Sequence, residues 1–494
     1  MRGAQTQPGH APSADSAAGL AAVVVGGGIS GLLAARGLAK AGITVTVLEA
    51  GEAWGGCVGR HTVGGLVLDS GAESFATRST AVADLARDLG LGGNIVAPRP
   101  GGAWVQLPDG PQELPKTGVL GIPANPWDPE VRRSLGFAGS LRASLDRYLP
   151  AWVGTSAEVT SVSSLVRARM GKRVLERLVA PVVGGVHSAD PGLLDVDMVA
   201  PGLRAALRQH GSLAAAVASQ RKAAPNRNGS GTAKAGSAVG GLKGGMNTLV
   251  AALVAELRAQ GVALVSGALV DSITRTESGW QATAVGTTYD AGRLVVALDG
   301  PAAVGLLEKA LPELSALRPA AGPLVSLVTL VVDVPELDRR PRGTGILVAP
   351  QTEGIEAKAL THATAKWDWL AEEAGPGTHV LRLSYGRGEG ADAPESAAAQ
   401  SVASLNDDAL LDAALRDAST LLTVPIVRED VLDWDVVRWA GALPFAAVGH
   451  KQRVAEVRRI CAEADGLSVV GGWLAGNGLA AVVADTSAQI DAVL

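Results

Sequence analysis

The chain has 494 residues, of which 47% are hydrophobic and 18% charged, so it is long enough for more than one domain and too apolar to be disordered throughout. Its formal net charge is −5 and it has no basic cluster that would neutralise a run of phosphates, which excludes nucleic acid as an expected partner and favours a small molecule. Two cysteines, Cys57 and Cys461, form neither a disulfide framework nor a zinc-binding spacing, so we expect a reducing, cytoplasmic setting and no metal.

The N-terminal region begins with residues 1–18, whose Ala, Ser and Pro content predicts a disordered tail. An uncharged stretch over 16–35 has the length of a membrane span, but glycines interrupt it and no secretory signal pattern precedes it, so we expect no membrane crossing. The apolar run 21–25 is typical of a buried parallel strand. A glycine-rich turn then leads to a predicted helix over 32–41 and a second strand over 43–48, which together form a βαβ unit.

The turn of this βαβ unit carries the motif Gly-x-Gly-x-x-Gly at Gly26, Gly28 and Gly31. Gly26 permits a tight turn, Gly28 lets the backbone approach a pyrophosphate, and Gly31 lets the helix pack on the strand. Glu49 ends the second strand, where its carboxylate can accept hydrogen bonds from a ribose diol. Because the motif lies between a strand and a helix and is followed by this acid, we predict a dinucleotide site rather than an ordinary glycine turn.

The rest of the chain alternates between helical and strand patterns. From residue 80 to 210 the periodicity is mostly helical, with predicted helices over 84–89, 131–149, 163–179 and 199–209. Residues 222–241, rich in Ala, Gly, Ser, Asn and Lys, predict a flexible loop. After it we predict helices over 246–260, 406–421 and 479–493, strands over 262–265, 280–285, 293–297, 324–334, 345–348, 357–364, 380–385 and 467–470, and a glycine-rich loop over 471–478.

Two segments near the N-terminus resemble a known family. Residues 49–56 read Glu-Ala-Gly-Glu-Ala-Trp-Gly-Gly, similar to the Glu-Ala-x-x-Arg-x-Gly-Gly pattern of flavoproteins with the glutathione-reductase-type FAD fold. Residues 68–78 resemble the Asp-x-Gly-x-Glu-x-Phe segment of bacterial porphyrinogen oxidases. With 471–483 and the matching segments in between, the chain resembles the actinobacterial type of the FAD-dependent coproporphyrinogen III and protoporphyrinogen oxidase family, within the flavin amine oxidase superfamily. It departs from the pattern at Ala53, where the family has arginine, and at His187, where an aromatic is usual.

The resemblance implies an α/β fold with a Rossmann-like FAD-binding domain, a mixed-sheet substrate domain and a helical subdomain. The FAD-binding domain would be discontinuous and consist of 20–77, 236–299 and 433–494. The substrate domain would consist of 78–110 and 300–432, and 111–215 would form a helical subdomain that faces a membrane or a partner.

The resemblance also implies an activity. Family members hold FAD non-covalently and oxidise a porphyrinogen by removing six electrons in three hydride transfers to the flavin N5, with dioxygen as acceptor and hydrogen peroxide as by-product. We therefore expect conversion of coproporphyrinogen III to coproporphyrin III in haem biosynthesis, hand-over of the product to ferrochelatase, and at most peripheral contact with the inner face of the cell membrane. Three alternatives stay open: oxidation of protoporphyrinogen IX, oxidation of an amine, and a non-enzymatic binding protein that has lost FAD.

The residues that the motifs and the resemblance assign to the cofactor are Gly26, Gly28, Ile29, Ser30, Gly31, Glu49, Ala50, Gly55, Gly56, Gly71, Ala72, Glu73, Val270, Trp439, Trp473, Gly478 and Leu479. Propionates are recognised by cations, preferably guanidinium groups, and the expected substrate-binding residues are Arg78, Lys366, Arg387 and Lys451. We assign no catalytic acid or base. For His450 a structural hydrogen bond to a loop carbonyl and a role near the cofactor both stay open, and we expect Cys57 to be a small buried residue.

Overall fold

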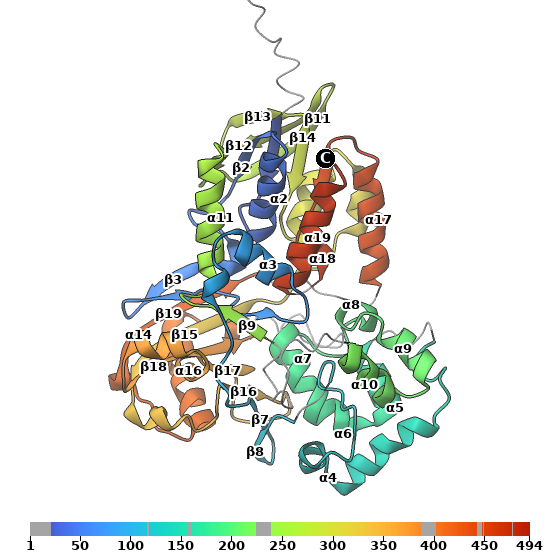
Figure 1. Ribbon diagram of the computed structural model, residues 1–494, viewed down its shortest axis with the longest axis vertical. Coiled ribbons are helices and arrows are strands. Elements are labelled where there is room, and N and C mark those ends of the chain that lie inside the picture. Colours follow the sequence, from blue (N-terminus) through green and yellow to red (C-terminus); the bar gives the residue numbers. More distant parts are fainter. Residues whose placement is uncertain are drawn as a thin grey trace, which may run out of the picture.

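The computed structural model describes residues 21–115, 118–156, 161–223, 239–386, 402–441, 447, 449–476 and 478–494. Figure 1 shows three parts. The first part is a sheet with its flanking helices, and the first strand and the last helix belong to it. A second sheet lies below the first part in this view, and a block of helices lies beside the second sheet. The fold class is α/β, as the sequence predicts. Among the described residues, no helix combines the length and the apolarity that crossing a membrane requires. The predicted tail 1–18 and Arg387 lie outside the described residues.

The first sheet is parallel throughout and has the strand order β10-β2-β1-β14-β20. The strands are β1 (Ala21–Val25), β2 (Thr44–Leu48), β10 (Ala263–Val265), β14 (Arg293–Val296) and β20 (Leu467–Val469). The valine-rich β1 is buried on both faces, which is typical of the centre of a parallel sheet. Since these strands come from three distant stretches of sequence, the sheet brings the two ends of the chain together.

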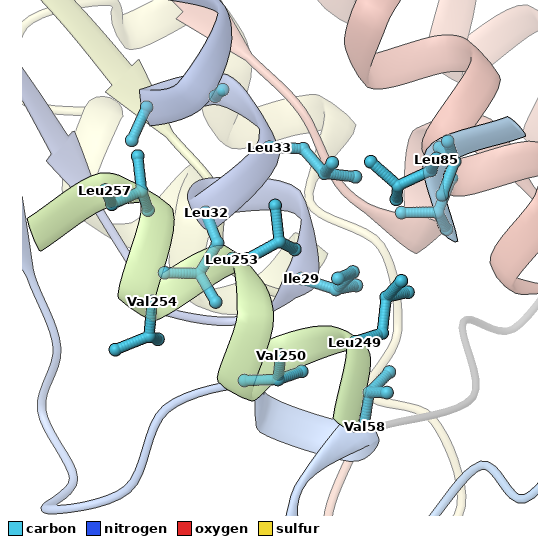
Figure 2. Close-up of a cluster of buried hydrophobic side chains, with 14 of the residues drawn as sticks. Ile29, Leu32, Leu33, Val58, Leu85, Leu249, Val250, Leu253, Val254 and Leu257 are labelled. Atoms are coloured by element: carbon cyan, nitrogen blue, oxygen red, sulfur yellow. The ribbon is translucent and has the colours of Figure 1, made fainter. Parts of the chain in front are cut away.

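One face of this sheet is covered by helices α2 (Ile29–Lys40), α11 (Asn247–Ala259), α19 (Leu479–Asp491) and α3 (Ala81–Asp88). Figure 2 shows the contact between α2 and α11, to which Leu32 and Leu253 contribute. Both side chains are fully buried, and burying a leucine contributes about 1.5–3 kcal/mol. This packing fixes the position of α2, and with it the glycine turn that precedes the helix.

The other face is covered by a three-stranded antiparallel sheet and two helices. The sheet consists of β11 (Val270–Thr276), β12 (Gly279–Ala284) and β13 (Thr287–Ala291), and the helices are α12 (Gly300–Leu307) and α17 (His450–Ala462). Trp280 lies in the middle of this core and donates its indole N–H to the carbonyl of Asp465 at 2.9 Å. The parallel sheet is therefore covered on both faces, as parallel sheets require.

The second sheet is mixed, with the order β19-β15-β18-β17-β16-β7-β8. Its strands are β7 (Trp104–Leu107), β8 (Gly110–Glu113), β15 (Val325–Asp333), β16 (Gly345–Val348), β17 (Ala359–His362), β18 (Thr378–Tyr385) and β19 (Val431–Trp439). All neighbours are antiparallel except β16 and β7. Helix α16 (Asp407–Leu422) packs on the sheet, and its buried Asp417 accepts the N–H of Ala357 at 2.7 Å.

The helical block has its own core. Its helices are α4 (Pro129–Ser144), α5 (Val162–Met170), α6 (Lys172–Val174), α7 (Ala180–His187), α8 (Val196–Val199), α9 (Leu203–His210) and α10 (Leu213–Ala223). A fully buried ion pair joins Arg169 Nε to Asp146 Oδ1 at 2.6 Å. Arg169 also donates to the carbonyls of Pro150 and Gly211 at 2.8 and 2.9 Å, so one guanidinium connects three segments of the block.

Short elements complete the described chain. They are β3 (Arg60–Val63), β4 (Leu66–Asp69), β5 (Phe75–Ala76), β6 (Ile95–Val96), β9 (Val239–Leu242), α13 (Ala363–Lys366), α14 (Asp368–Ala374), α18 (Gly472–Ala475), the 3-10 turns Gly56–Val58, Gly92–Asn94, Leu145–Tyr148, Pro312–Leu317, Pro335–Arg339, Val402–Ser404 and Arg428–Asp430, and one π turn, Leu175–Val179.

Two predicted loops contain regular structure. The predicted flexible loop 222–241 ends in β9, because Gly240 and Leu242 pair with Phe75 and Ile95 of two short strands that have no sequence signal of their own. The predicted loop 471–478 contains the single-turn helix α18. Both corrections have the same reason: tertiary contacts order glycine-rich segments whose local sequence favours a loop.

The assignment of segments to sheets also differs from the predicted domains. Residues 433–439, expected in the FAD-binding domain, belong to β19 at the edge of the second sheet. In the other direction, α3 and α12, expected in the substrate domain, pack into the cores on the two faces of the first sheet. The amphipathic pattern of a helix predicts that one face is buried, but not which of two sheets will bury it.

Candidate active site

The turn between β1 and α2 holds three glycines with different roles. Gly26 has a φ of +104°, and a Cβ added to it would lie 2.6 Å from the carbonyl oxygen of Ala297. A Cβ at Gly31 would overlap the carbonyl oxygen of Gly26, so the absence of a side chain lets α2 approach the sheet. Apart from its neighbours in the chain, a Cβ at Gly28 would meet no atom of the described residues within 4 Å. The backbone at Gly28 therefore borders open space directly before the first amides of α2, where a pyrophosphate would bind.

Glu49 lies beside this turn, at the end of β2. Its Oε2 accepts a hydrogen bond of 2.6 Å from the Gly27 N–H, and its Oε1 accepts one of 2.8 Å from the Gly51 N–H. These two bonds fix the orientation of the carboxylate. Each oxygen retains a further acceptor position, so the carboxylate can still receive a ribose diol.

The glycine pair Gly55 and Gly56 packs against the glycine turn between β1 and α2. The Gly55 N–H donates to the carbonyl of Gly27 at 2.8 Å, and a Cβ at Gly56 would lie 3.4 Å from the Cα of Gly28. Trp54 packs on Gly27, where an added Cβ would lie 2.5 Å from an indole carbon. No dinucleotide motif includes Trp54, which the structure adds to the site.

Cys57 follows this glycine pair and is exposed, so the expectation that it is buried is wrong. It lies in the 3-10 turn Gly56–Val58, in which Val58 is the buried residue and Gly56 and Cys57 are exposed. Desolvation by the surrounding protein nevertheless raises the pKa of its thiol. Its carbonyl accepts the Ala72 N–H at 2.8 Å and so connects this turn to the next segment.

Residues 69–73, called the Gly71 segment below, link the first sheet to the second. Asp69 starts the segment, and its carboxylate accepts the N–H groups of Met246 and Asn247 at 2.9 and 2.8 Å. These are amides at the start of α11 that have no partner within the helix. Burial raises the pKa of Asp69, although its hydrogen bonds and Arg382 act in the opposite direction. The Gly71 segment is therefore anchored to the dinucleotide domain at its first residue.

Two side chains of the second sheet bind the carbonyls of the Gly71 segment. The Trp439 indole N–H donates to the carbonyl of Ser70 at 2.9 Å. Arg382 Nη1 donates to the carbonyl of Gly71 at 2.7 Å. Trp439 is a predicted cofactor residue, and its described contact is to the backbone beside Gly71. Arg382 is a residue that the sequence motifs miss.

Glu73, another predicted cofactor residue, forms two ion pairs. Its Oε1 pairs with Lys366, and its Oε2 lies 3.1 Å from Arg382 Nη2. Burial alone would raise the pKa of Glu73, but the two cations outweigh burial and hold this pKa at about 2. The Glu73 carboxylate is therefore paired with two cations of the protein. Lys366, which is predicted to bind a substrate propionate, is one of these two cations.

The C-terminal segment contributes helix α19, which packs against α2. Helix α19 begins at Leu479 after Gly478, whose φ is +112°, and packs on α2 and α3. In its first turn the Ala481 N–H donates to the carbonyl of Gly478 at 3.1 Å, whereas the N–H groups of Leu479 and Ala480 have no partner within the helix. Trp473 lies in the core on the opposite face of the sheet, where its carbonyl accepts the buried His450 Nε2–H at 2.7 Å. This contact is the structural one of the two roles left open for His450.

The remaining predicted cofactor residues lie around the same turn. Ile29 and Ser30 are buried in the first turn of α2, and Ala50 is exposed. Val270 is buried at the start of β11, just after Ala268, whose N–H donates to the carbonyl of Glu49 at 2.8 Å.

The predicted substrate-binding cations that the structure describes differ in exposure and in ion pairing. Arg78 and Lys451 are exposed and form no ion pair with another described residue. Lys366 is partly buried and bound to Glu73. Arg387 directly follows the last described residue of its stretch, Gly386. Two free cations, Arg78 and Lys451, are therefore present among the described residues for recognition of an anionic substrate.

A cavity lies between the Gly71 segment and the second sheet. Its walls include the buried hydroxyl of Thr329 and the buried indole N–H of Trp369, neither of which has a hydrogen-bond partner among the described residues. The other lining residues are Leu68, Asp69, Glu73, Leu242, Gly245, Ala363, Trp367, Leu370, Val380 and Arg382. The cavity thus contacts the same Asp69, Glu73 and Arg382 that organise the Gly71 segment.

The parallel sheet, the glycine turn open at Gly28 and the acid at Glu49 define a dinucleotide-binding protein, and comparison with known proteins narrows the class to flavoprotein oxidoreductases. Residues 29–483 match the family of flavin-containing amine oxidoreductases. Because the match spans most of the chain, the protein belongs to this family and binds a flavin.

Relatives and solved structures agree with this family. The chain is 31% identical to coproporphyrinogen III oxidase of Mycobacterium leprae, over 95% of this chain and 97% of that protein. It is 28% identical to coproporphyrinogen III oxidase of Bacillus subtilis, over 92% and 94%. The fold matches the crystal structure of a putative protoporphyrinogen oxidase from Exiguobacterium sp. 255-15 with a TM-score of 0.77 at 23% identity, covering 96% of this chain and 98% of that one.

Proposed function

We propose that the protein is an FAD-dependent oxidase that converts coproporphyrinogen III to coproporphyrin III, with dioxygen as acceptor. The observation that carries the proposal is the similarity to bacterial coproporphyrinogen III oxidases, at 31% identity over nearly the full length of both chains for the Mycobacterium leprae protein. The conversion removes six hydrogens from the macrocycle, and three dioxygen molecules take them up as three hydrogen peroxide molecules.

The residues of the glycine turn fit FAD rather than a mononucleotide flavin. Gly28 leaves room for a pyrophosphate at the start of α2, and Glu49 retains acceptor capacity for the ribose diol of an adenosine. A 2′-phosphate would be repelled by the same carboxylate, which disfavours NADP. When bound, the flavin accepts two electrons and a proton equivalent from the substrate at each step. The protein supplies the binding, the orientation and the exclusion of water.

Substrate recognition requires cations, because coproporphyrinogen III is a tetracarboxylate. Arg78 follows the Gly71 segment by a few residues and is exposed, so we propose it as a propionate ligand. Lys451 and Arg387 are proposed alongside it. Lys366 is less suited to this role because a propionate would have to displace Glu73.

The substrate is tested by aerobic incubation of the flavin-loaded protein with coproporphyrinogen III, protoporphyrinogen IX or putrescine, with porphyrin fluorescence and peroxide as readouts. We expect porphyrin from coproporphyrinogen III at the highest kcat/KM. A preference for protoporphyrinogen IX would support the alternative that a plant relative suggests, since the chain is 28% identical over 48% of its length to an Arabidopsis thaliana protein named protoporphyrinogen oxidase 2. Peroxide from putrescine alone would contradict porphyrinogen oxidation.

Arg78→Ala tests the propionate ligand. We expect a KM for coproporphyrinogen III that is raised about tenfold, because loss of a charge-assisted hydrogen bond costs about 1.5–3 kcal/mol. Arg87→Ala, which removes an exposed arginine on α3, is the matched control and should leave KM unchanged. An unchanged KM in Arg78→Ala would remove Arg78 from the substrate site.

For the localisation we propose peripheral membrane contact through the helical block. Six of its large apolar side chains are exposed: Trp127, Phe137, Leu141, Leu145, Tyr148 and Trp152. The exposed Arg132, Arg133 and Arg147 lie in the same stretch of sequence, and aromatic rings with flanking cations are typical of contact with anionic lipid.

Sedimentation with phosphatidylglycerol vesicles tests this contact. The triple substitution Phe137→Ala, Tyr148→Ala and Trp152→Ala should reduce the bound fraction. The control pair Leu269→Ala and Leu432→Ala removes exposed leucines outside the block and should leave the bound fraction unchanged. Equal binding of both variants and the wild type would contradict the proposed surface.

A further inference from the structure

Arg382 lies at the junction between the two sheets. It is on β18, between the buried Leu381 and Leu383, and its side chain is only 15% exposed. A charged group at such a position needs partners, because burial without them is costly. Arg382 finds them in the Gly71 segment: the carbonyls of Asp69 and Gly71 at 3.3 and 2.7 Å, and the carboxylate of Glu73 at 3.1 Å.

The charged side chains at this junction are Lys366, Arg382, Glu73 and Asp69. Lys366 and Arg382 both pair with Glu73, and the side chains of all three are 14–15% exposed. Because Glu73 stays ionised at neutral pH beside the two cations, Lys366, Arg382 and Glu73 carry two positive charges and one negative charge. The carboxyl group of Asp69, at the start of the Gly71 segment, also interacts electrostatically with Arg382. The low exposure of the cluster weakens screening by water, so its field extends beyond the surface of the Gly71 segment.

Both sheets fix the Gly71 segment. Hydrogen bonds from Arg382 and Trp439 hold the carbonyls of Gly71 and Ser70 toward the second sheet, while the Ala72 N–H is bound to the carbonyl of Cys57 in the dinucleotide domain. An added Cβ at Gly71 would overlap the carbonyl oxygen of Cys57, so the segment cannot carry a side chain there without moving.

We propose that Arg382 is a positioning residue for the flavin: it fixes the backbone of the Gly71 segment and raises the reduction potential of the bound flavin through its charge. The inference rests on the proposed function, because it assumes that the flavin ring lies along this segment. Reduction adds negative charge to the ring, so a nearby cation stabilises the reduced form more than the oxidised form. Glu73 offsets part of this effect, and its loss should act in the opposite direction.

Three variants of the flavin-loaded protein separate charge from packing. R382M removes the charge and all the guanidinium hydrogen bonds. R382K keeps a positive charge, but one ammonium group lacks the planar fork that reaches both Gly71 and Glu73. E73Q removes the negative charge and keeps Arg382. The matched control is R428M. Arg428 lies on an exposed turn beside the same sheet, and its Nη2 is 2.7 Å from Oδ1 of Asp412.

The measurements are the midpoint potential of the bound flavin, by equilibration with a reference dye, and the dissociation constant of FAD. We expect a more negative potential in R382M, a more positive potential in E73Q, and a potential close to that of the wild type in R382K. FAD should bind at least tenfold more weakly to R382M and R382K. R428M should change neither quantity. If R382M does not fold, the other two variants test the inference: the midpoint potential should become more positive in E73Q, and FAD should bind more weakly to R382K.

Unchanged potentials in R382M and E73Q, with a lower melting temperature as the only effect, would overturn the inference and leave Arg382 a structural residue. Shifts of the same sign in both variants would also overturn it. Failure of the wild-type chain to bind FAD would instead contradict the proposed function, and this inference with it, so the two failures are distinguishable.

Discussion

The carboxylate of Glu49 accepts a hydrogen bond of 2.6 Å from the N–H of Gly27, 22 residues earlier in the chain. This bond joins the end of β2 to the glycine turn that follows β1, so the acid that would bind the ribose also orders the loop that would bind the phosphates. The two parts of the dinucleotide motif are therefore one structural unit, and substitutions in either part should affect FAD binding.

Glu49→Gln should weaken FAD binding about 10- to 100-fold. The variant loses charge-assisted hydrogen bonds to the Gly27 N–H and to the ribose, and hydrogen bonds to charged groups contribute about 1.5–3 kcal/mol each. Titration of the apoprotein with FAD, followed by quenching of flavin fluorescence, gives the dissociation constant. Glu52→Gln, an exposed acid three residues away, is the control. Equal affinities of both variants would exclude Glu49 from the site.

Gly28→Ala should weaken FAD binding without affecting folding, whereas Gly31→Ala should destabilise the fold itself. Gly28 has an ordinary φ of −68° and open space around its Cβ position, so Gly28→Ala should keep the melting temperature of the apoprotein and lose most of its FAD affinity. In Gly31→Ala the new methyl group overlaps the carbonyl of Gly26, so the apoprotein itself should be destabilised by about 1–3 kcal/mol. Thermal melts with and without FAD distinguish the two. A fully functional Gly28→Ala would contradict a cofactor at this turn.

Asp146→Asn should destabilise the helical block by about 3–5 kcal/mol, because it leaves the buried Arg169 guanidinium without a counter-ion. Urea unfolding monitored by circular dichroism measures the change. Lys172→Met breaks an exposed pair with Glu176 in the same block and should cost less than about 1 kcal/mol. Similar effects of the two substitutions would show that Arg169 is not a central contact.

The ion pairs of Glu73 should make stability depend on pH in acid. The folded-state pKa of about 2 lies below the ordinary value of 4.5, so the stabilisation is complete above pH 4.5 and is lost as the pH falls from 4.5 toward 2. It amounts to something on the order of 3 kcal/mol at neutral pH. The difference in unfolding free energy between the wild type and Glu73→Gln should therefore shrink between pH 5 and pH 3. A difference that is constant over this range would contradict the lowered pKa.

The sequence indicates the dinucleotide turn because its determinants are local. A strand, three glycines and an acid within 30 residues are sufficient to predict it, and the structure gives Gly26, Gly28 and Gly31 the three distinct environments that the motif requires. The predicted strands and helices of the first sheet are correct for the same reason, since hydrophobic period and length identify them.

The Glu73 cluster could not be predicted, because it depends on contacts between distant residues. Glu73 and Lys366 are 293 residues apart, and Arg382 comes from a strand of the other sheet. The available signal was weak: a single arginine within the apolar run Val380–Leu383 implies a buried charge that must be paired, but not its partner. The expectation of a small buried residue at Cys57 is wrong because the short turn Gly56–Val58 buries Val58 and leaves Cys57 exposed.

If the proposed function is correct, coproporphyrinogen III reduces a flavin bound at this site, and anaerobic mixing of the FAD-loaded protein with coproporphyrinogen III measures this reduction. We predict bleaching of the visible flavin absorbance in the absence of dioxygen, because one FAD accepts two of the six electrons. Admission of dioxygen should restore the flavin absorbance, form hydrogen peroxide and produce porphyrin fluorescence. A flavin that stays oxidised in the presence of excess coproporphyrinogen III would exclude coproporphyrinogen III as the substrate.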